Sequence, residues 1–211
     1  MSYATDEERV EAIKRWWKEN GTAVILGLVV GLGGVVGWRL WTGHVESRAV
    51  DASEIYMAMV SAARQGSEIA HDHGTTLMEG YRKTPYAALA ALELARLAVE
   101  RDDLVLAEGR LRWAMAQART PEMVQVARTR LARVLIADGR AQDALKLLED
   151  PVPEGFLALV EELRGDAHRA LGDHARARAA YDRAMLISGG LSDYLQMKRD
   201  ALNTPVEVTG S

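Results

Sequence analysis

The stretch RGDAHRALGDHARARAAYDRAM, residues 164–185, joins two short helical patterns through a glycine, and it has two counterparts upstream. These are LARLAVERDDLVLAEGRLRWAM (94–115) and LARVLIADGRAQDALKLLED (131–150). When the three are aligned, small residues match at two positions and a large residue at a third: Ala95, Ala132 and Gly165; Ala107, Ala144 and Ala177; Leu111, Leu148 and Tyr181. The units are offset by 37 and 33 residues, which is typical of stacked helix pairs that bury their apolar faces against one another.

The same alignment places Gly139 and Gly172 in the tight turn between the two helices of a unit, where a Cβ is unfavourable. Asp102 takes this place in the first unit. Residues 51–87 are expected to form a diverged helix pair, and residues 191–202 a final helix that caps the array. The sequence therefore predicts an all-α solenoid of three clear units and one diverged unit.

The third unit resembles the tetratricopeptide repeat, which is about 34 residues long. Residues at five positions stand where that repeat has Gly or Ala, Gly, Ala, an aromatic residue and Ala: Gly165, Gly172, Ala177, Tyr181 and Ala184. The first two units have leucine in place of the aromatic residue. The resemblance implies a protein-binding solenoid.

A second feature is the apolar stretch NGTAVILGLVVGLGGVVGWRLW, residues 20–41, which has no charge between Gly21 and Trp38. Eighteen helical residues span roughly 27 Å, close to the roughly 30 Å of a bilayer core. Tryptophans bracket the stretch at the positions where membrane interfaces favour them: Trp16, Trp17, Trp38 and Trp41. The stretch is longer than the core of a cleaved signal, and it lacks the polar residues of a buried soluble helix. A permanent transmembrane helix is therefore the favoured interpretation.

Basic residues near the ends of this span predict its orientation. Four precede it and two follow it within twenty residues: Arg9, Lys14, Arg15 and Lys18, against Arg39 and Arg48. This bias places the N-terminus in the cytoplasm. The expected organisation is a short cytoplasmic helix (1–20), an anchor (21–41), a linker (42–50), the repeat domain (51–203) and a polar tail (204–211).

Three glycines in the span, Gly27, Gly31 and Gly34, fall at helical spacing and predict a smooth seam where another membrane helix packs closely. The alternative is that glycine is simply common in membrane helices. The seam suits a heteromeric contact or a homo-oligomer equally well.

The composition and motifs argue against several functional classes. With a net charge of −4, the chain as a whole is not basic enough to suggest nucleic-acid binding, and the absence of cysteine excludes disulfides and thiolate sites. The five histidines form no His-Glu-x-x-His motif, and neighbouring carboxylates on a helix do not converge on one substrate. His71 and His73 are expected in a solvated turn. We therefore predict a protein that is not an enzyme and holds no metal or cofactor.

The chain as a whole resembles the YfgM-like ancillary subunit family of the bacterial SecYEG translocon. The resemblance rests on DEERVEAIKRWWKENG (6–21), the glycine-rich span, and YRKTPYAALAALELARLAVERDDLVLAEGRLRWAM (81–115). It implies a single-pass protein of the bacterial inner membrane with a periplasmic repeat domain. The implied partners are the translocon and a periplasmic chaperone, for example a membrane-anchored prolyl isomerase, to which emerging secretory proteins are handed. An anchored scaffold or regulator of cell-envelope assembly or stress signalling is the alternative.

The partner segment is expected in the concave groove lined by the first helix of each unit, as the repeat family implies. The predicted groove positions are Leu89, Leu92, Arg96, Val99, Val126, Thr129, Arg133, Ile136, Leu159, Glu162, Asp166 and Arg169. The alternative is that some of these only pack between units. The only asparagines, Asn20 and Asn203, lie outside the clear units, so the asparagine–lysine carboxylate clamp of some tetratricopeptide domains is not expected.

Overall fold

The computed structural model describes residues 6–190 and 192–203, with only the backbone described at 6–7, 40–41, 43–46 and 203. The chain divides into two compact units, Met1–Val50 and Asp51–Ser211. Every element along the described ranges is helical, so the predicted all-α class is confirmed. The predicted polar tail lies outside the described residues.

The first helix, α1 (Asp6–Arg64), contains a candidate membrane span at Glu8–Arg39 with a mean hydropathy of 1.9. Only 6% of its most apolar window is buried by the protein itself, so the side chains there are left for another apolar environment. The sequence suggested a separate short helix, an anchor and a linker. The backbone of residues 6–50 is one continuous helix that runs on to Arg64, and no proline interrupts it.

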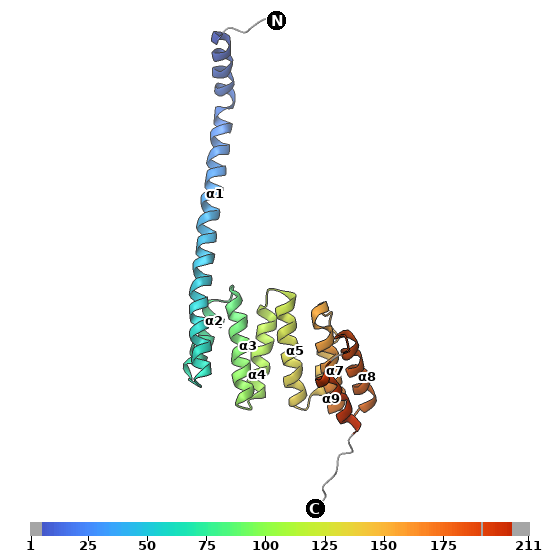
Figure 1. The fold of residues 1–211 in the computed structure, drawn as a ribbon. Coiled ribbons are helices and arrows are strands. Elements are labelled where there is room, and N and C mark those ends of the chain that lie inside the picture. The colour runs from blue at the N-terminus through green and yellow to red at the C-terminus, as the bar shows by residue number, and fades with distance from the viewer. Residues whose placement is uncertain (1–5, 191, 204–211) are drawn as a thin grey trace, which may run out of the picture. The chain divides into compact units, whose positions relative to one another are not determined.

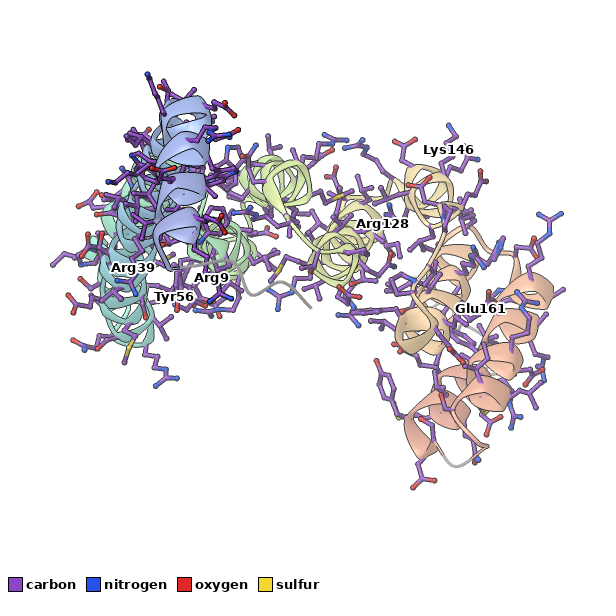
Figure 2. The ribbon with its side chains drawn as sticks, turned by 90° about the horizontal axis from the view of Figure 1, so that it is seen from above. Arg9, Arg39, Tyr56, Arg128, Lys146 and Glu161 are labelled. Atoms are coloured by element: carbon purple, nitrogen blue, oxygen red, sulfur yellow. The ribbon has the colours of Figure 1, made fainter. Side chains whose placement is uncertain are left out.

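The second unit consists of helices arranged as consecutive antiparallel pairs (Figure 1). The end of α1 pairs with α2 (Ile69–Gly80), and three further pairs and a last helix follow. These are α3 (Pro85–Glu100) with α4 (Leu104–Gln117), α5 (Pro121–Ala137) with α6 (Ala141–Leu147), α7 (Leu157–Ala170) with α8 (His174–Ile187), and α9 (Asp193–Asp200). Short 3₁₀ turns lie at Glu154–Phe156 and Ala201–Asn203. Viewed along the helices, α5 and α7 lie in one layer and α4 and α6 in the other (Figure 2).

The three turns inside the clear units share one backbone conformation. Asp102, Gly139 and Gly172 have φ of 60°, 76° and 76°, in the left-handed region that ends many helices. The next helix then begins two residues later in each unit, and Asp103 and Asp173 cap α4 and α8 by accepting hydrogen bonds from backbone N–H groups. Asp102 is tolerated because aspartate adopts this conformation at lower cost than larger residues do.

The matched small and large residues form the contacts between helices. The alanines at 107, 144 and 177 are fully buried, and so are Leu111, Leu148 and Tyr181 one turn later. The small side chains let neighbouring helices approach, and the large ones fill the space between them. The prediction that these positions hold the solenoid together is confirmed.

Gly165 shows how tight this packing is, and it yields a testable prediction. A Cβ at Gly165 would lie 2.6 Å from Cδ1 of the fully buried Tyr181 ring. Gly165→Ala should therefore overpack the contact between α7 and α8 by about 1–3 kcal/mol, against a gain in helix propensity of about 1 kcal/mol. We expect a net loss of about 1 kcal/mol in the free energy of unfolding, measured by urea titration.

Gly109 provides the matched control because it lies inside α4, is exposed, and has nothing within 4 Å of its missing Cβ. Gly109→Ala should stabilise the protein by about 0.5–1 kcal/mol, since only the propensity gain remains. Equal changes in the free energy of unfolding for the two substitutions would show that the Tyr181 ring moves aside without cost, contrary to the packing described.

Candidate functional site

The first helices of the units enclose two adjoining hollows. The first has a volume of about 410 Å³ and lies between α3, α4 and α5. Its walls are mainly apolar, and three arginines and one glutamate also line it: Leu92, Ala95, Val99, Leu104, Leu111, Val134 and Ala137, with Glu93, Arg96, Arg130 and Arg133. Such a hollow accepts a large apolar side chain and offers charged groups to what surrounds it.

The second hollow, about 290 Å³, lies between α5, α7 and α9. It is more polar, and its lining residues are Arg133, Ile136, Ala137, Glu162, Asp166, Arg169, Tyr194 and Lys198. Arg133 and Ala137 line both hollows, so the two adjoin. We call them together the groove, with the apolar hollow at α3–α5 and the polar hollow at α5–α9.

The groove brings together eight of the twelve residues predicted to line it: Leu92, Arg96, Val99, Arg133, Ile136, Glu162, Asp166 and Arg169. Leu89, Val126 and Leu159 are partly buried and pack against the hydrophobic core of the units. Thr129 is 3% exposed, and its hydroxyl donates to the carbonyls of Gln125 and Val126 in its own helix. These four line neither hollow.

Sequence reasoning missed the groove residues that come from other positions and other helices. Glu93 and Arg130 are 37 residues apart, which is the offset between the first two units. They are therefore charged residues at matched repeat positions, and this match could have indicated that both line the groove. The floor residues Leu104 and Leu111 come from α4, and Tyr194 and Lys198 from the capping helix. The repeat pattern assigned Leu111 to the packing between helices and gave no signal for the other three.

The carboxylates of the groove are already paired with cations. Arg96 contacts Glu93 and, one turn further on, Glu100. Lys198 Nζ lies 2.7 Å from both Glu162 Oε1 and Asp166 Oδ2, and these three side chains are largely buried. Lys198 also lies over the rings of Tyr181 and Tyr194, 5.9 and 4.8 Å from their centroids. The capping helix is thereby fastened to α7.

Three arginines of the groove are different: Arg130, Arg133 and Arg169 have no ion pair or hydrogen bond from their side chains among the described residues. Arg130 and Arg133 are also exposed. Five cationic and three anionic side chains line the two hollows, although the whole chain carries a net charge of −4. The groove is therefore locally positive on an acidic protein.

The Lys198 contacts lead to a second prediction. Lys198→Met removes the cation that lies between the Glu162 and Asp166 carboxyl groups, which are only 14% and 15% exposed, and leaves both without that partner. We expect a loss of about 2–3 kcal/mol in stability and faster hydrogen exchange of the α9 amides. The exposed pair of Lys146 and Asp143 supplies the control, since Lys146→Met should change stability by less than about 0.5 kcal/mol. Unchanged exchange in α9 would contradict this assignment.

The same cluster predicts sensitivity to alkaline pH. Burial lowers the pKa of the Lys198 ammonium, but hydrogen bonds to Asp166 and Glu162 outweigh it, so the pKa stands above 10.5. Burial and the hydrogen bond donated to Asp166 (2.7 Å) raise the pKa of Tyr181 above 10.0. Both groups bind their protons more tightly in the folded state than in the unfolded state. Their contribution to the free energy of unfolding is therefore complete below about pH 10 and is lost as pH rises. Urea titrations between pH 8 and about 11 should show this fall, and it should shrink in Lys198→Met with Tyr181→Phe.

A third hollow, about 210 Å³, lies between α2, α3 and α4 and includes His71 in the first turn of α2. His71 and His73 thus lie on a helix and not in the expected turn. Within residues 6–190 and 192–203, no three His, Asp or Glu side chains gather in a way that would hold a metal ion.

A family model described as a tetratricopeptide repeat-like domain matches residues 14–204, which include the uncharged stretch 21–38 and the repeats. A protein of Escherichia coli (strain K12) named an ancillary SecYEG translocon subunit is 34% identical over 203 residues, covering 95% of this chain and 98% of that protein. The chain belongs to the ancillary SecYEG translocon subunit family.

The family membership extends over the full length. A Haemophilus influenzae protein of the same name is 30% identical and covers 96% of this chain and 99% of its own. A Neisseria gonorrhoeae ancillary SecYEG translocon subunit at 24% identity still covers 95% and 99%. No solved structure matches the chain. The relatives therefore align with both the candidate span and the repeats of this chain.

Proposed function

We propose that this protein is a non-enzymatic adaptor of the bacterial inner membrane. Its N-terminus is cytoplasmic, and its repeat domain is periplasmic. It associates with SecYEG and links emerging secretory proteins to a periplasmic chaperone, with a membrane-anchored prolyl isomerase as one type. The observation that carries the proposal is the full-length similarity to proteins named for SecYEG, together with a groove built by the first helices of the repeats.

Two features of α1 support the membrane part of the proposal. The apolar side chains of the span are exposed along the helix, and Trp16, Trp17 and Trp38 remain exposed near its ends. Four basic residues precede the uncharged stretch and two follow it, which favours a cytoplasmic N-terminus. A Cβ at Gly27, Gly31 or Gly34 would meet nothing within 4 Å, so this seam is open to a helix of another protein.

The repeat domain supports the binding part. The apolar hollow suits an anchoring side chain, and the polar hollow beside it offers hydrogen-bonding and charged groups along the same groove. α9 contributes Tyr194 and Lys198 to the end of the groove, so the capping helix is part of the proposed site. Binding there leaves the outer layer of α4 and α6 uncovered.

Site-specific photo-crosslinking in native membranes tests this function. Probes replace Val29 in the span, Arg133 in the groove, and Lys146 on α6 as a control. The Lys146 side chain is 75% exposed and points away from the α5–α7 layer (Figure 2). We expect translocon subunits at Val29 and a periplasmic chaperone at Arg133, with no chaperone product at Lys146.

The other outcomes separate the parts of the proposal. Products with cytoplasmic proteins at Arg133 would reverse the orientation and remove the periplasmic role. Chaperone products of equal yield at Arg133 and Lys146 would move the contact out of the groove. Signalling or wall-synthesis proteins in place of translocon subunits would support an envelope scaffold or regulator, and self-products alone would support a homo-oligomer.

A further inference from the structure

The carboxylates and the arginines of the groove differ in whether they have oppositely charged partners within the domain. Each carboxylate that lines it, namely Glu93, Glu162 and Asp166, has a cation as partner within the domain. Arg130, Arg133 and Arg169 line it without a carboxylate partner among the described residues. An arginine guanidinium binds a carboxylate through two parallel hydrogen bonds, and this pairing is specific in geometry. Among the described residues, the arginines of the groove are therefore available to anions, whereas its carboxylates already contact cations.

The position of these arginines relates them to the apolar hollow. Arg130 and Arg133 line the hollow whose other residues are mainly Leu, Val and Ala, and Arg133 also lines the polar hollow with Arg169. A segment that places an apolar side chain between Leu92, Leu111 and Val134 would have its neighbouring residues beside Arg130 and Arg133. Carboxylates at those neighbouring residues would pair with the arginines, whereas lysines there would be repelled.

We propose that the groove selects an acidic partner segment: a stretch with one large apolar side chain flanked by aspartate or glutamate. The apolar side chain occupies the α3–α5 hollow, and carboxylates on either side pair with Arg130, Arg133 and Arg169. The inference rests on the proposed function, because it names the partner chemistry of the same groove. It predicts that the groove prefers acidic segments, a preference that neither the repeat architecture nor the translocon association requires.

The test is fluorescence anisotropy with the full chain in a neutral detergent and three synthetic peptides. The first has a central phenylalanine flanked by aspartates, the second has lysines in place of the aspartates, and the third has serine in place of the phenylalanine. At low salt the acidic apolar peptide should bind about tenfold more tightly than the lysine peptide. The difference should shrink as added salt screens the charges. The serine peptide should lose most of the affinity because its anchor is missing.

The variant Arg130→Glu with Arg133→Glu should weaken binding of the acidic peptide by about tenfold and remove its advantage over the lysine peptide. A matched control changes the same number of charges outside the groove: Lys146→Glu with Arg176→Glu, at side chains 75% and 74% exposed. This control should bind as the wild type does. Arg130→Gln with Arg133→Gln, which adds no negative charge, should give an intermediate loss. Circular dichroism checks that each variant keeps its helices.

Equal binding of the acidic and lysine peptides, no binding of the acidic peptide, or equal losses in the groove and control variants would each overturn the proposal. Self-association of the chain that blocks binding of the acidic peptide would assign the groove to a second copy and overturn the proposal. If crosslinking still gives a chaperone product at Arg133 alongside any of these results, the adaptor function stands and only the proposed charge preference is lost. If the chaperone product is absent but the groove still selects the acidic peptide, the charge preference stands and the adaptor function is lost.

Discussion

Val29→Arg together with Leu32→Arg is expected to release the chain from the membrane fraction. Both side chains are exposed near the middle of the candidate span, where only 6% of the most apolar window is buried by the protein. Each arginine at the centre of a membrane helix costs about 2.5–3.5 kcal/mol, so the pair costs about 5–7 kcal/mol. That removes the preference of this glycine-rich helix for the bilayer. Flotation in a density gradient after alkaline carbonate treatment measures the result.

The control for this experiment exchanges the two residues, Val29→Leu with Leu32→Val, and keeps the apolar character and volume. The exchanged chain should float with the membranes as the wild type does. Flotation separates membrane-bound chains from aggregates, which remain at the bottom of the gradient. If the double-arginine chain still floats, the apolar span of α1 is not what holds the protein in the bilayer, and another part of the chain must bind the membrane.

Tyr181→Ala should produce the largest loss of stability in the repeat domain, about 3–5 kcal/mol. Tyr181 is fully buried against Gly165, and its hydroxyl donates a 2.7 Å hydrogen bond to Asp166. Truncation leaves a cavity between α7 and α8 that rigid helices cannot close. It also removes a ring beside Lys198, which fastens the capping helix. Urea titration of the full chain in detergent gives the total loss.

Tyr181→Phe separates the ring from the hydroxyl. The phenylalanine keeps the packing against Gly165 and loses only the bond to Asp166, so we expect a smaller loss of about 1.5–3 kcal/mol. Hydrogen exchange should place both effects in α7, α8 and α9, with α3 and α4 unaffected. Equal losses in the two variants would assign the whole contribution to the hydroxyl and contradict the packing argument.

The capping helix connects this stability to the groove. α9 supplies Tyr194 and Lys198 to the polar hollow, and its position depends on contacts with α7 and with Tyr181. We therefore expect Tyr181→Ala to weaken peptide binding in the groove although Tyr181 does not line it. Arg133 products in crosslinking should fall in parallel.

Much of the fold could be predicted because local residue requirements repeat. A turn that needs a left-handed residue selects Gly139, Gly172 and, less well, Asp102, and all three adopt that conformation. A close approach of two helices selects small residues at matched positions, and those alanines are buried. The candidate span was equally visible, because eighteen uncharged residues in a row are long enough to cross a bilayer.

The groove was only partly predictable because its lining depends on how neighbouring helices rotate and cross. Successive residues of a helix point about 100° apart, so the rotation of α5 about its axis decides whether Thr129 or Arg130 faces the groove. Thr129 is buried and Arg130 lines the apolar hollow, although the repeat pattern favoured the former. The contributions of α4 and α9 come from elements that the pattern did not assign to the groove.

The sequence by itself determined the helical repeat, the candidate anchor and the turn positions, since each follows from requirements within one helix or one helix pair. The tertiary structure decided which side chains face the groove, that Lys198 fastens the capping helix through Glu162 and Asp166, and that three arginines remain without carboxylate partners among the described residues. These features depend on distances between side chains on different helices. Such distances are set by the packing angles of the whole array and not by the spacing of residues along the chain.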